Sequence, residues 1–105
     1  MYTEIAEVAS REVVAGYHAR FVHTATMTIG FWNVTADAVM PLHHHPHEQV
    51  SQVIEGEFEM MLDGERYLLK PGAVLTIPSN AVHGGRALTA CKLLDIFSPV
   101  REDYK

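Results

Sequence analysis

Residues 41–49 hold the densest group of potential metal ligands in this chain. Four of the seven histidines of the chain lie within five consecutive positions here. In a β-strand alternate side chains share a face, so His43 and His45 can point toward one ion while His44 points away. Gln49 follows shortly after them, where an amide oxygen could complete the set. These residue types predict an imidazole-rich site for one divalent metal ion.

A further candidate ligand, His83, lies far along the chain after the turn residues Pro78-Ser79-Asn80. Three imidazoles and one oxygen suit Zn, Ni, Fe, Mn or Co, and affinity alone does not decide among them. Two alternatives to a metal site are a solvated histidine-rich turn and a purification tag. A tag would be terminal, whereas this run lies in the middle of the chain. Gln49 could also be a buried amide that bonds only to the backbone.

A second group of candidates lies near the C-terminus. Asp95 interrupts the apolar segment Lys92–Phe97, where a carboxylate is costly unless it is paired or functional. Asp95 and Phe97 share a strand face, so both can face the barrel interior. Burial should raise the pKa of Asp95, which would suit a general acid or base at neutral pH. Arg101, beyond the Ser98-Pro99 turn, could fold over the mouth and bind a carboxylate through two hydrogen bonds.

Each of these residues also has a purely structural interpretation. Asp95 could form an ion pair with an arginine such as Arg86. Phe97 could be an ordinary core residue, and Arg101 could be a solvated residue of the tail. Trp32 and the methionines are expected in the core or the pocket lining.

The segments that must position these residues are predicted strands. Helical periodicity is weak, and only Met1–Val14 could hold a short helix. From Tyr17 onward, β-branched and aromatic residues alternate with Gly, Pro and Asn, which is typical of a sandwich or barrel of short strands. The predicted strands are His23–Val34, Gln52–Leu62, Glu65–Leu69, Ala73–Ile77 and Lys92–Phe97, with turns at Asp63-Gly64, Pro71-Gly72 and Pro78-Ser79-Asn80.

Composition narrows the class of protein. A chain of 105 residues with 48% hydrophobic residues predicts one small globular domain. A net charge of −5 without a basic stripe argues against a nucleic-acid partner. No signal peptide is visible, and the uncharged stretch Phe21–Ala36 is too short and too rich in Thr to span a membrane. A single cysteine, Cys91, excludes an internal disulfide and suits the cytoplasm.

The spacing of the candidate ligands resembles the cupin family. The first cupin motif, Gly-x5-His-x-His-x3or4-Glu-x6-Gly, and the second, Gly-x5-Pro-x-Gly-x2-His-x3-Asn, occur in order. In this chain the first becomes Asp37, His43, His45, Gln49 and Gly56, and the second becomes Gly72, Pro78, Asn80, His83 and Ala87. The position of Gly56 assigns Gln49, and not Glu48, to the ligand position. Asn80 tolerates positive φ nearly as well as the usual Gly.

This resemblance implies an all-β fold, a single-domain double-stranded β-helix or jelly-roll barrel. The barrel is expected over residues 17–105, with residues 1–16 as an N-terminal extension or dimer arm. Because a short barrel buries little apolar surface and exposes an edge strand, we expect a homodimer.

The glutamine after the histidines and the C-terminal pattern Asp-x-Phe-Ser-Pro-x-Arg-Glu-Asp-Tyr further resemble the pectin-degradation cupins known as KdgF. Those proteins convert 4,5-unsaturated uronate monosaccharides, from pectin or alginate breakdown, into the linear ketone form. The resemblance implies metal ligands His43, His45, Gln49 and His83, and active-site roles for Asp95, Phe97 and Arg101. Two alternative functions are a cupin dioxygenase acting on a small organic substrate and a non-catalytic sugar-binding cupin.

Overall fold

Strands follow one another from Arg11 to Ser98, and the computed structural model, which describes residues 1–105, has no α-helix. In chain order the strands are β1 (Arg11–Val14), β2 (Tyr17–His23), β3 (Thr28–Val34), β4 (Val39–His43), β5 (Glu48–Glu55), β6 (Phe58–Leu62), β7 (Glu65–Leu69), β8 (Val74–Ile77), β9 (His83–Ala87) and β10 (Cys91–Ser98). Two 3₁₀ turns, η1 (Ile5–Glu7) and η2 (Glu102–Tyr104), lie near the two ends of the chain. None of the helical segments has the length and apolar character needed to cross a membrane.

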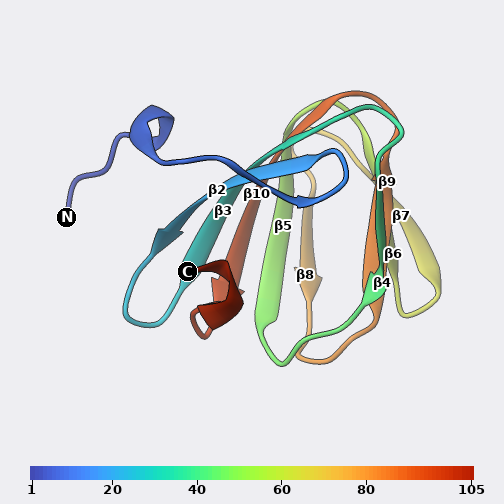
Figure 1. The fold of residues 1–105 in the computed structure, drawn as a ribbon. Coiled ribbons are helices and arrows are strands. Elements are labelled where there is room, and N and C mark those ends of the chain that lie inside the picture. The colour runs from blue at the N-terminus through green and yellow to red at the C-terminus, as the bar shows by residue number, and fades with distance from the viewer.

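The strands form two antiparallel sheets that face each other (Figure 1). The larger sheet has the strand order β1-β2-β3-β10-β5-β8, and the smaller has the order β4-β9-β6-β7. The chain passes repeatedly from one sheet to the other, so β10 lies between β3 and β5, and β9 lies between β4 and β6. The expected all-β double-stranded β-helix is confirmed. This winding brings the end of β4 and the starts of β5 and β9 to the same end of the barrel.

The N-terminal segment differs from the sequence prediction. The short helix that Met1–Val14 could hold is reduced to the single 3₁₀ turn η1, and the strand β1 occupies the end of this range. β1 pairs with β2 and so extends the six-stranded sheet. The physical reason is local: the β-branched pair Val13 and Val14 favours an extended backbone, and the edge of β2 offers unpaired backbone groups.

One predicted strand is shorter than expected at its start. His23–Val34 was predicted to be continuous, but β3 begins only at Thr28. The Thr24 hydroxyl accepts hydrogen bonds from the backbone N–H groups of Thr26 (3.2 Å) and Met27 (2.9 Å). Such local bonds offer the backbone an alternative to strand pairing, so this segment forms the β2–β3 turn.

The other difference is a break in the predicted strand Gln52–Leu62, which Gly56 divides into β5 and β6. Gly56 has a φ of +92°, and a Cβ atom there would lie 2.3 Å from the carbonyl oxygen of Ala90. Only glycine fits a left-handed conformation at such a close approach. The break ends β5 and sends the chain to the opposite sheet, which fixes the length of the strand that carries Gln49.

Two predicted turns have the expected backbone. Asp63 and Gly64, with φ of 47° and 82°, join β6 to β7 as the sequence predicted for a tight hairpin. Asn80 replaces the usual cupin glycine and has a φ of 63°, which confirms that its side chain tolerates the left-handed region. This turn precedes β9 and therefore sets the position of His83.

Apolar side chains fill the space between the sheets. Tyr17, Trp32 and Phe58 are buried at its centre, with the Tyr17 ring in edge-to-face contact with both others at centroid distances of 6.2 and 6.3 Å. Several polar residues are buried as well, although burial of a polar group is costly unless it is paired. They are Thr28, His45, Gln49, Ser51, His83, Asp95 and Arg101. These buried polar groups therefore need partners from one another or from a ligand.

Candidate metal centre and its pocket

Three histidines meet at one end of the barrel. His43 ends β4, His83 begins β9 in the opposed register position, and His45 lies in the connection to β5. One ring nitrogen from each lies within 4.8 Å of those from the other two. His45 and His83 are buried and His43 is half-buried. The structure thus brings together three sequence-predicted residues, two from β4 and the connection that follows it and one from a segment nearly forty positions away.

The backbone fixes which nitrogen of each ring is free. Each Nδ1 donates to a carbonyl oxygen two residues away, at 2.8 Å for His43, 3.0 Å for His45 and 2.9 Å for His83. A carbonyl oxygen can only accept, so each Nδ1 must carry the proton. A neutral ring then has its lone pair on Nε2, which is the arrangement that orients a metal-binding histidine.

Gln49 directs its side-chain oxygen at the same point. Its Oε1 lies 3.1 Å from Nε2 of His45 and 3.1 Å from Nε2 of His83. The amide nitrogen donates to the Ser51 hydroxyl at 3.0 Å and to Oδ2 of Asp95 at 3.4 Å. Because a carboxylate only accepts, Asp95 favours this orientation of the amide and so keeps the oxygen toward the histidines.

The chemistry of this donor set fits a metal ion. With every Nδ1 protonated, the Nε2 lone pairs and the Gln49 oxygen face one another without a proton between them. A divalent cation would satisfy all of these acceptors at once, and three imidazoles with one oxygen suit a transition metal. The three histidines therefore fit a metal site.

Burial also keeps the imidazoles available to a metal. It lowers the pKa of His83 to about 4. Burial also lowers the pKa of His45, and the positive charge of Arg101 adds to that effect. Protons compete with metals for the ring lone pair. At neutral pH these rings are therefore uncharged, and that competition is weak.

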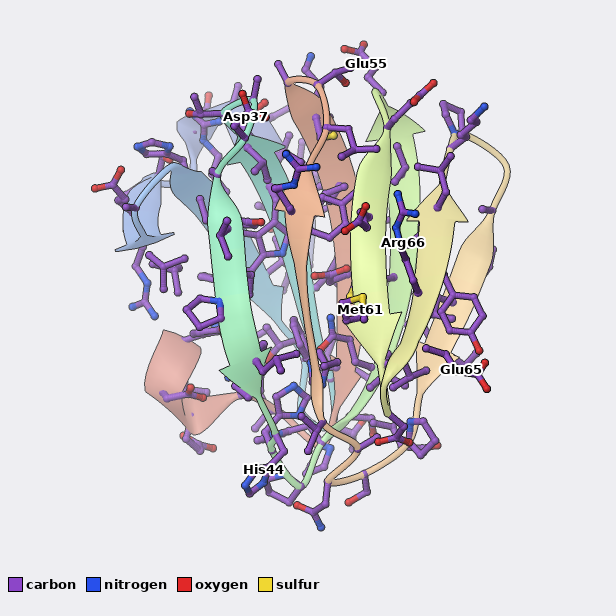
Figure 2. All side chains as sticks on the ribbon, turned by 90° about the vertical axis from the view of Figure 1, so that its right-hand side faces the viewer. Asp37, His44, Glu55, Met61, Glu65 and Arg66 are labelled. Carbon is purple, nitrogen blue, oxygen red and sulfur yellow. The ribbon has the colours of Figure 1, made fainter.

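His43, His83 and Gln49 line a cavity with about 440 Å³ of empty volume, part of which is open to solvent. Apolar side chains, among them Trp32, Phe58 and Met60, make up much of its wall. Figure 2 shows that Asp37 and Glu55 lie at the opposite end of the barrel from His44, the histidine of the run that points outward. The cavity thus combines an apolar wall with a few polar groups, as small-molecule sites do.

Asp95 lies on β10 and faces this cavity with an incomplete set of hydrogen bonds. Its Oδ2 accepts from Gln49, while its buried Oδ1 has no partner. Burial raises the pKa of Asp95 to about 7, in the direction expected from the sequence. The alternative pairing with Arg86 is wrong, because Arg86 pairs with Asp37 at 3.3 Å on the surface. No ion pair explains the burial of this carboxyl group.

Phe97 and Arg101 also line the cavity. Phe97 is buried with the core hydrophobic residues, and Arg101 is buried as well, so it is not the solvated tail residue considered as an alternative. The Phe97 ring packs 5.9 Å from that of His45, centroid to centroid, and the Arg101 guanidinium carbon lies 4.8 Å from the Phe97 ring centroid. Arg101 is buried, and its side chain is 8% exposed. It does not lie open across the mouth, since its Nε and Nη2 are held by Asp103 at 3.1 and 2.9 Å.

The remaining histidines of the run lie outside the metal-facing group. His44 is exposed and points away from the barrel (Figure 2). His47 is half-buried at the rim, and its carbonyl oxygen accepts the Nδ1 proton of His45. His47 therefore supports the site through its backbone, a role that no pattern of side chains could have shown.

Three residues of the site were missed by sequence reasoning. Ser51 accepts the amide hydrogen bond of Gln49, and Asp103 pairs with Arg101. Thr28, fully buried, accepts the backbone N–H of Arg101 at 2.8 Å through its hydroxyl. Ser51 could have been found, because it shares the inward face of a strand with Gln49. Nothing in the periodicity of the sequence indicates the contacts of Thr28 and Asp103.

Comparisons with known proteins agree with this fold. The cupin-domain family model matches residues 30–97. The pectin degradation protein KdgF of Dickeya dadantii (strain 3937) is 37% identical over 65 residues, which cover 61% of this chain and 59% of that protein. The match thus spans less than two thirds of the length of that curated relative.

Two solved structures match almost the whole chain. KdgF from Halomonas sp. is 30% identical, with a TM-score of 0.93 and coverage of 100% of this chain and 98% of that one. An RmlC-like cupin from Shewanella frigidimarina NCIMB 400 is 28% identical, with a TM-score of 0.93 and coverage of 99% and 95%. The chain belongs to the cupin family and resembles KdgF within it.

Proposed function

We propose that this protein is a metal-dependent enzyme that converts 4,5-unsaturated uronate monosaccharides, the products of pectin or alginate breakdown, into linear ketonised uronates. One observation carries the proposal: a buried carboxyl group with an unpartnered oxygen, Asp95, adjoins the acceptor cluster of three histidines and Gln49. The similarity to KdgF, a pectin degradation protein, supports the same substrate class.

The metal ligands in this proposal are His43, His45, Gln49 and His83. None of the four brings a negative charge to the site, so a bound divalent cation would keep its full charge and supply a strong Lewis acid to substrate oxygens. A carboxylate in place of Gln49, as in the usual cupin motif, would lower that charge. Its negative charge would also face Asp95, whose Oδ2 lies 3.4 Å from the Gln49 amide nitrogen. The amide therefore suits a site that must also hold a second carboxyl group.

The reaction needs one proton to move from an oxygen to a carbon. The anomeric hydroxyl loses its proton, the C1–O5 bond breaks to give a C1 aldehyde and a C5 enolate, and C4 then gains a proton. Asp95 accepts the first proton and delivers one to C4, so that no other reactant is required. Its unpartnered Oδ1 is the atom free to do so, while the bond from Gln49 to Oδ2 orients the group.

The rest of the cavity holds the sugar. Arg101 binds the substrate carboxylate, because a guanidinium group matches that anion in shape and charge. Phe97 forms the adjacent wall and packs against both Arg101 and His45. These contacts link the anion-binding group to the metal ligands, so the carboxylate and the reacting atoms are placed relative to one another.

The proposal is tested by adding a 4,5-unsaturated galacturonate monosaccharide to protein loaded in turn with Zn, Ni, Fe, Mn and Co. We expect loss of the ultraviolet absorbance of the enol ether, faster than in buffer with free metal, with a ketone product identified by NMR. Absence of turnover with every metal would contradict the proposal. Oxygen consumption with Fe(II) would instead indicate a dioxygenase, and tight binding without turnover a sugar-binding cupin.

We also propose that the protein is a homodimer. On the outer face of the six-stranded sheet, the apolar side chains of Phe31, Leu94 and Ile96 are only half-buried, and Phe31 pairs with Leu94 across two central strands. Residues 1–10 are largely exposed and could serve as a dimer arm. A face of this kind commonly marks a protein interface. Light scattering should give twice the mass of the chain, and a monomer at micromolar concentration would contradict the proposal.

A further inference from the structure

In the C-terminal turn, the carboxylate of Asp103 is hydrogen-bonded to Arg101, the arginine that lines the cavity. Asp103 Oδ1 and Oδ2 accept from Nε and Nη2 of Arg101 at 3.1 and 2.9 Å. This two-bond pair uses one edge of the guanidinium group. Nη1, on the other edge, forms no hydrogen bond in the structure. Arg101 therefore keeps one edge for a ligand while the other is occupied.

Aromatic rings restrict the same guanidinium group. Its central carbon lies 4.8 Å from the ring centroid of Phe97 and 4.1 Å from that of Tyr104. The Tyr104 ring in turn stacks on Phe21 at a centroid distance of 4.3 Å. The rings fix the plane in which the guanidinium lies but leave its rotation within that plane free. The bonds from Asp103 remove that freedom.

We infer that Asp103 is a positioning residue for substrate carboxylates, which acts by aiming the free edge of Arg101 into the cavity. The inference rests on the anion-binding role proposed above for Arg101. A long arginine side chain loses several rotatable bonds when it binds a ligand. Asp103 provides this ordering in advance, so binding of the anion loses less entropy. The cost is partial neutralisation of the arginine, which is limited because the Asp103 side chain is 59% exposed and screened by water.

The turn itself does not depend on the Asp103 side chain. The backbone oxygen of Asp103 accepts from Nη2 of Arg11 at 2.9 Å, and the Tyr104 N–H donates to the oxygen of Arg101 at 3.0 Å. Substitution of the carboxylate leaves these bonds in place. The neighbouring Glu102 provides a matched control, because it carries the same charge in the same turn and pairs only with Lys105 at 3.4 Å.

The test compares Asp103→Asn, Asp103→Glu and Glu102→Gln with the wild type, all metal-loaded, by calorimetric titration with galacturonate and with galactose. Asp103→Asn should weaken galacturonate binding about tenfold, as expected for loss of a well-placed charge-assisted contact, and leave galactose binding within about twofold. Asp103→Glu should recover part of the loss, and Glu102→Gln should behave as the wild type.

Several outcomes would overturn the inference. Equal weakening for both sugars would show a general structural role, and tighter galacturonate binding in Asp103→Asn would show that Asp103 competes with the ligand. Equal affinity of the wild type for galacturonate and galactose would show that the cavity has no anion-binding site. Because these are binding measurements, they decide the role of Asp103 even if no unsaturated uronate is turned over. Where turnover occurs, the loss should appear in KM with kcat nearly unchanged.

Discussion

Asp95→Asn should reduce kcat on an unsaturated uronate by about 10²- to 10⁴-fold while the metal content stays unchanged, because the variant removes the proton acceptor but none of the metal ligands. The side chain keeps its size, and its oxygen can still accept from Gln49, so the fold and the cavity should persist. Turnover is followed by the ultraviolet absorbance of the substrate, and bound metal by mass spectrometry of the dialysed protein. Full turnover by the metal-loaded variant would exclude Asp95 from proton transfer.

The pH dependence gives a second measurement of the same residue. Asp95 starts the proposed reaction as a carboxylate, so kcat/KM of the wild type should rise with pH through the pKa of this group. Burial raises that pKa to about 7, and a bound cation would lower it, so the rise should lie at or below pH 7. The pH profile of Asp95→Asn should lack this rise in kcat/KM. The surface variant Asp37→Asn, which removes a carboxylate at the other end of the barrel, should keep it.

The raised pKa of Asp95 should also make the metal-free protein less stable as the pH rises. In the metal-free protein the carboxyl group has a pKa of about 7 folded and 3.8 unfolded, so the folded state binds more protons between these values. The free energy of unfolding therefore falls as pH rises from 3.8 through 7. Asp95→Asn avoids this loss, and its metal-free form should be more stable than the wild type at pH 8 by on the order of 3 kcal/mol. Denaturant unfolding at pH 4 and pH 8 would measure the difference.

The metal-facing group was largely predictable because His43, Gln49 and His83 lie in strands and His45 lies only two residues beyond the end of one. Strand alternation separates His43 and His45 from His44, and the turn after Ile77 sets the distance to His83. Gly56 could serve as the reference position that assigns Gln49 as a ligand, because only glycine fits there. The same regularity gave Asp95 and Phe97 a common face. For every one of these residues except His45, the direction of the side chain follows from a strand whose register is set by the sheet.

The C-terminal turn could not be predicted in the same way. After Ser98-Pro99 the backbone leaves the sheet, and no period relates one side chain to the next. Arg101 was expected over the mouth, but the arrangement depends on three-dimensional neighbours: Asp103 beside it and Tyr104 against its face. At the N-terminus, the short helix within Met1–Val14 is limited to one 3₁₀ turn for a related reason. Weak local preferences there are overridden by pairing with a distant strand edge.

His83→Ala should have the largest effect on the metal itself. His83 is buried, and its Nε2 faces the Gln49 oxygen. Removal of the imidazole therefore deprives the metal of one ligand, and no neighbouring side chain can replace it. Replacing groups that merely support a ligand already costs about 10- to 100-fold in metal affinity, so loss of the ligand should exceed 100-fold. Turnover should fall to the level of the metal-free protein.

A thermal measurement makes this prediction independent of substrate. A metal that binds only the folded state stabilises it by about 2.7 kcal/mol at a concentration of 100 times Kd. The wild type should therefore gain thermal stability as Zn²⁺ or Ni²⁺ is added, whereas His83→Ala should gain almost none at the same concentration. His44→Ala removes an exposed imidazole from the same histidine run and should respond as the wild type does. A metal-dependent rise in Tm of His83→Ala equal to that of the wild type would show that the ion binds elsewhere, and the ligand set proposed for the cavity would be wrong.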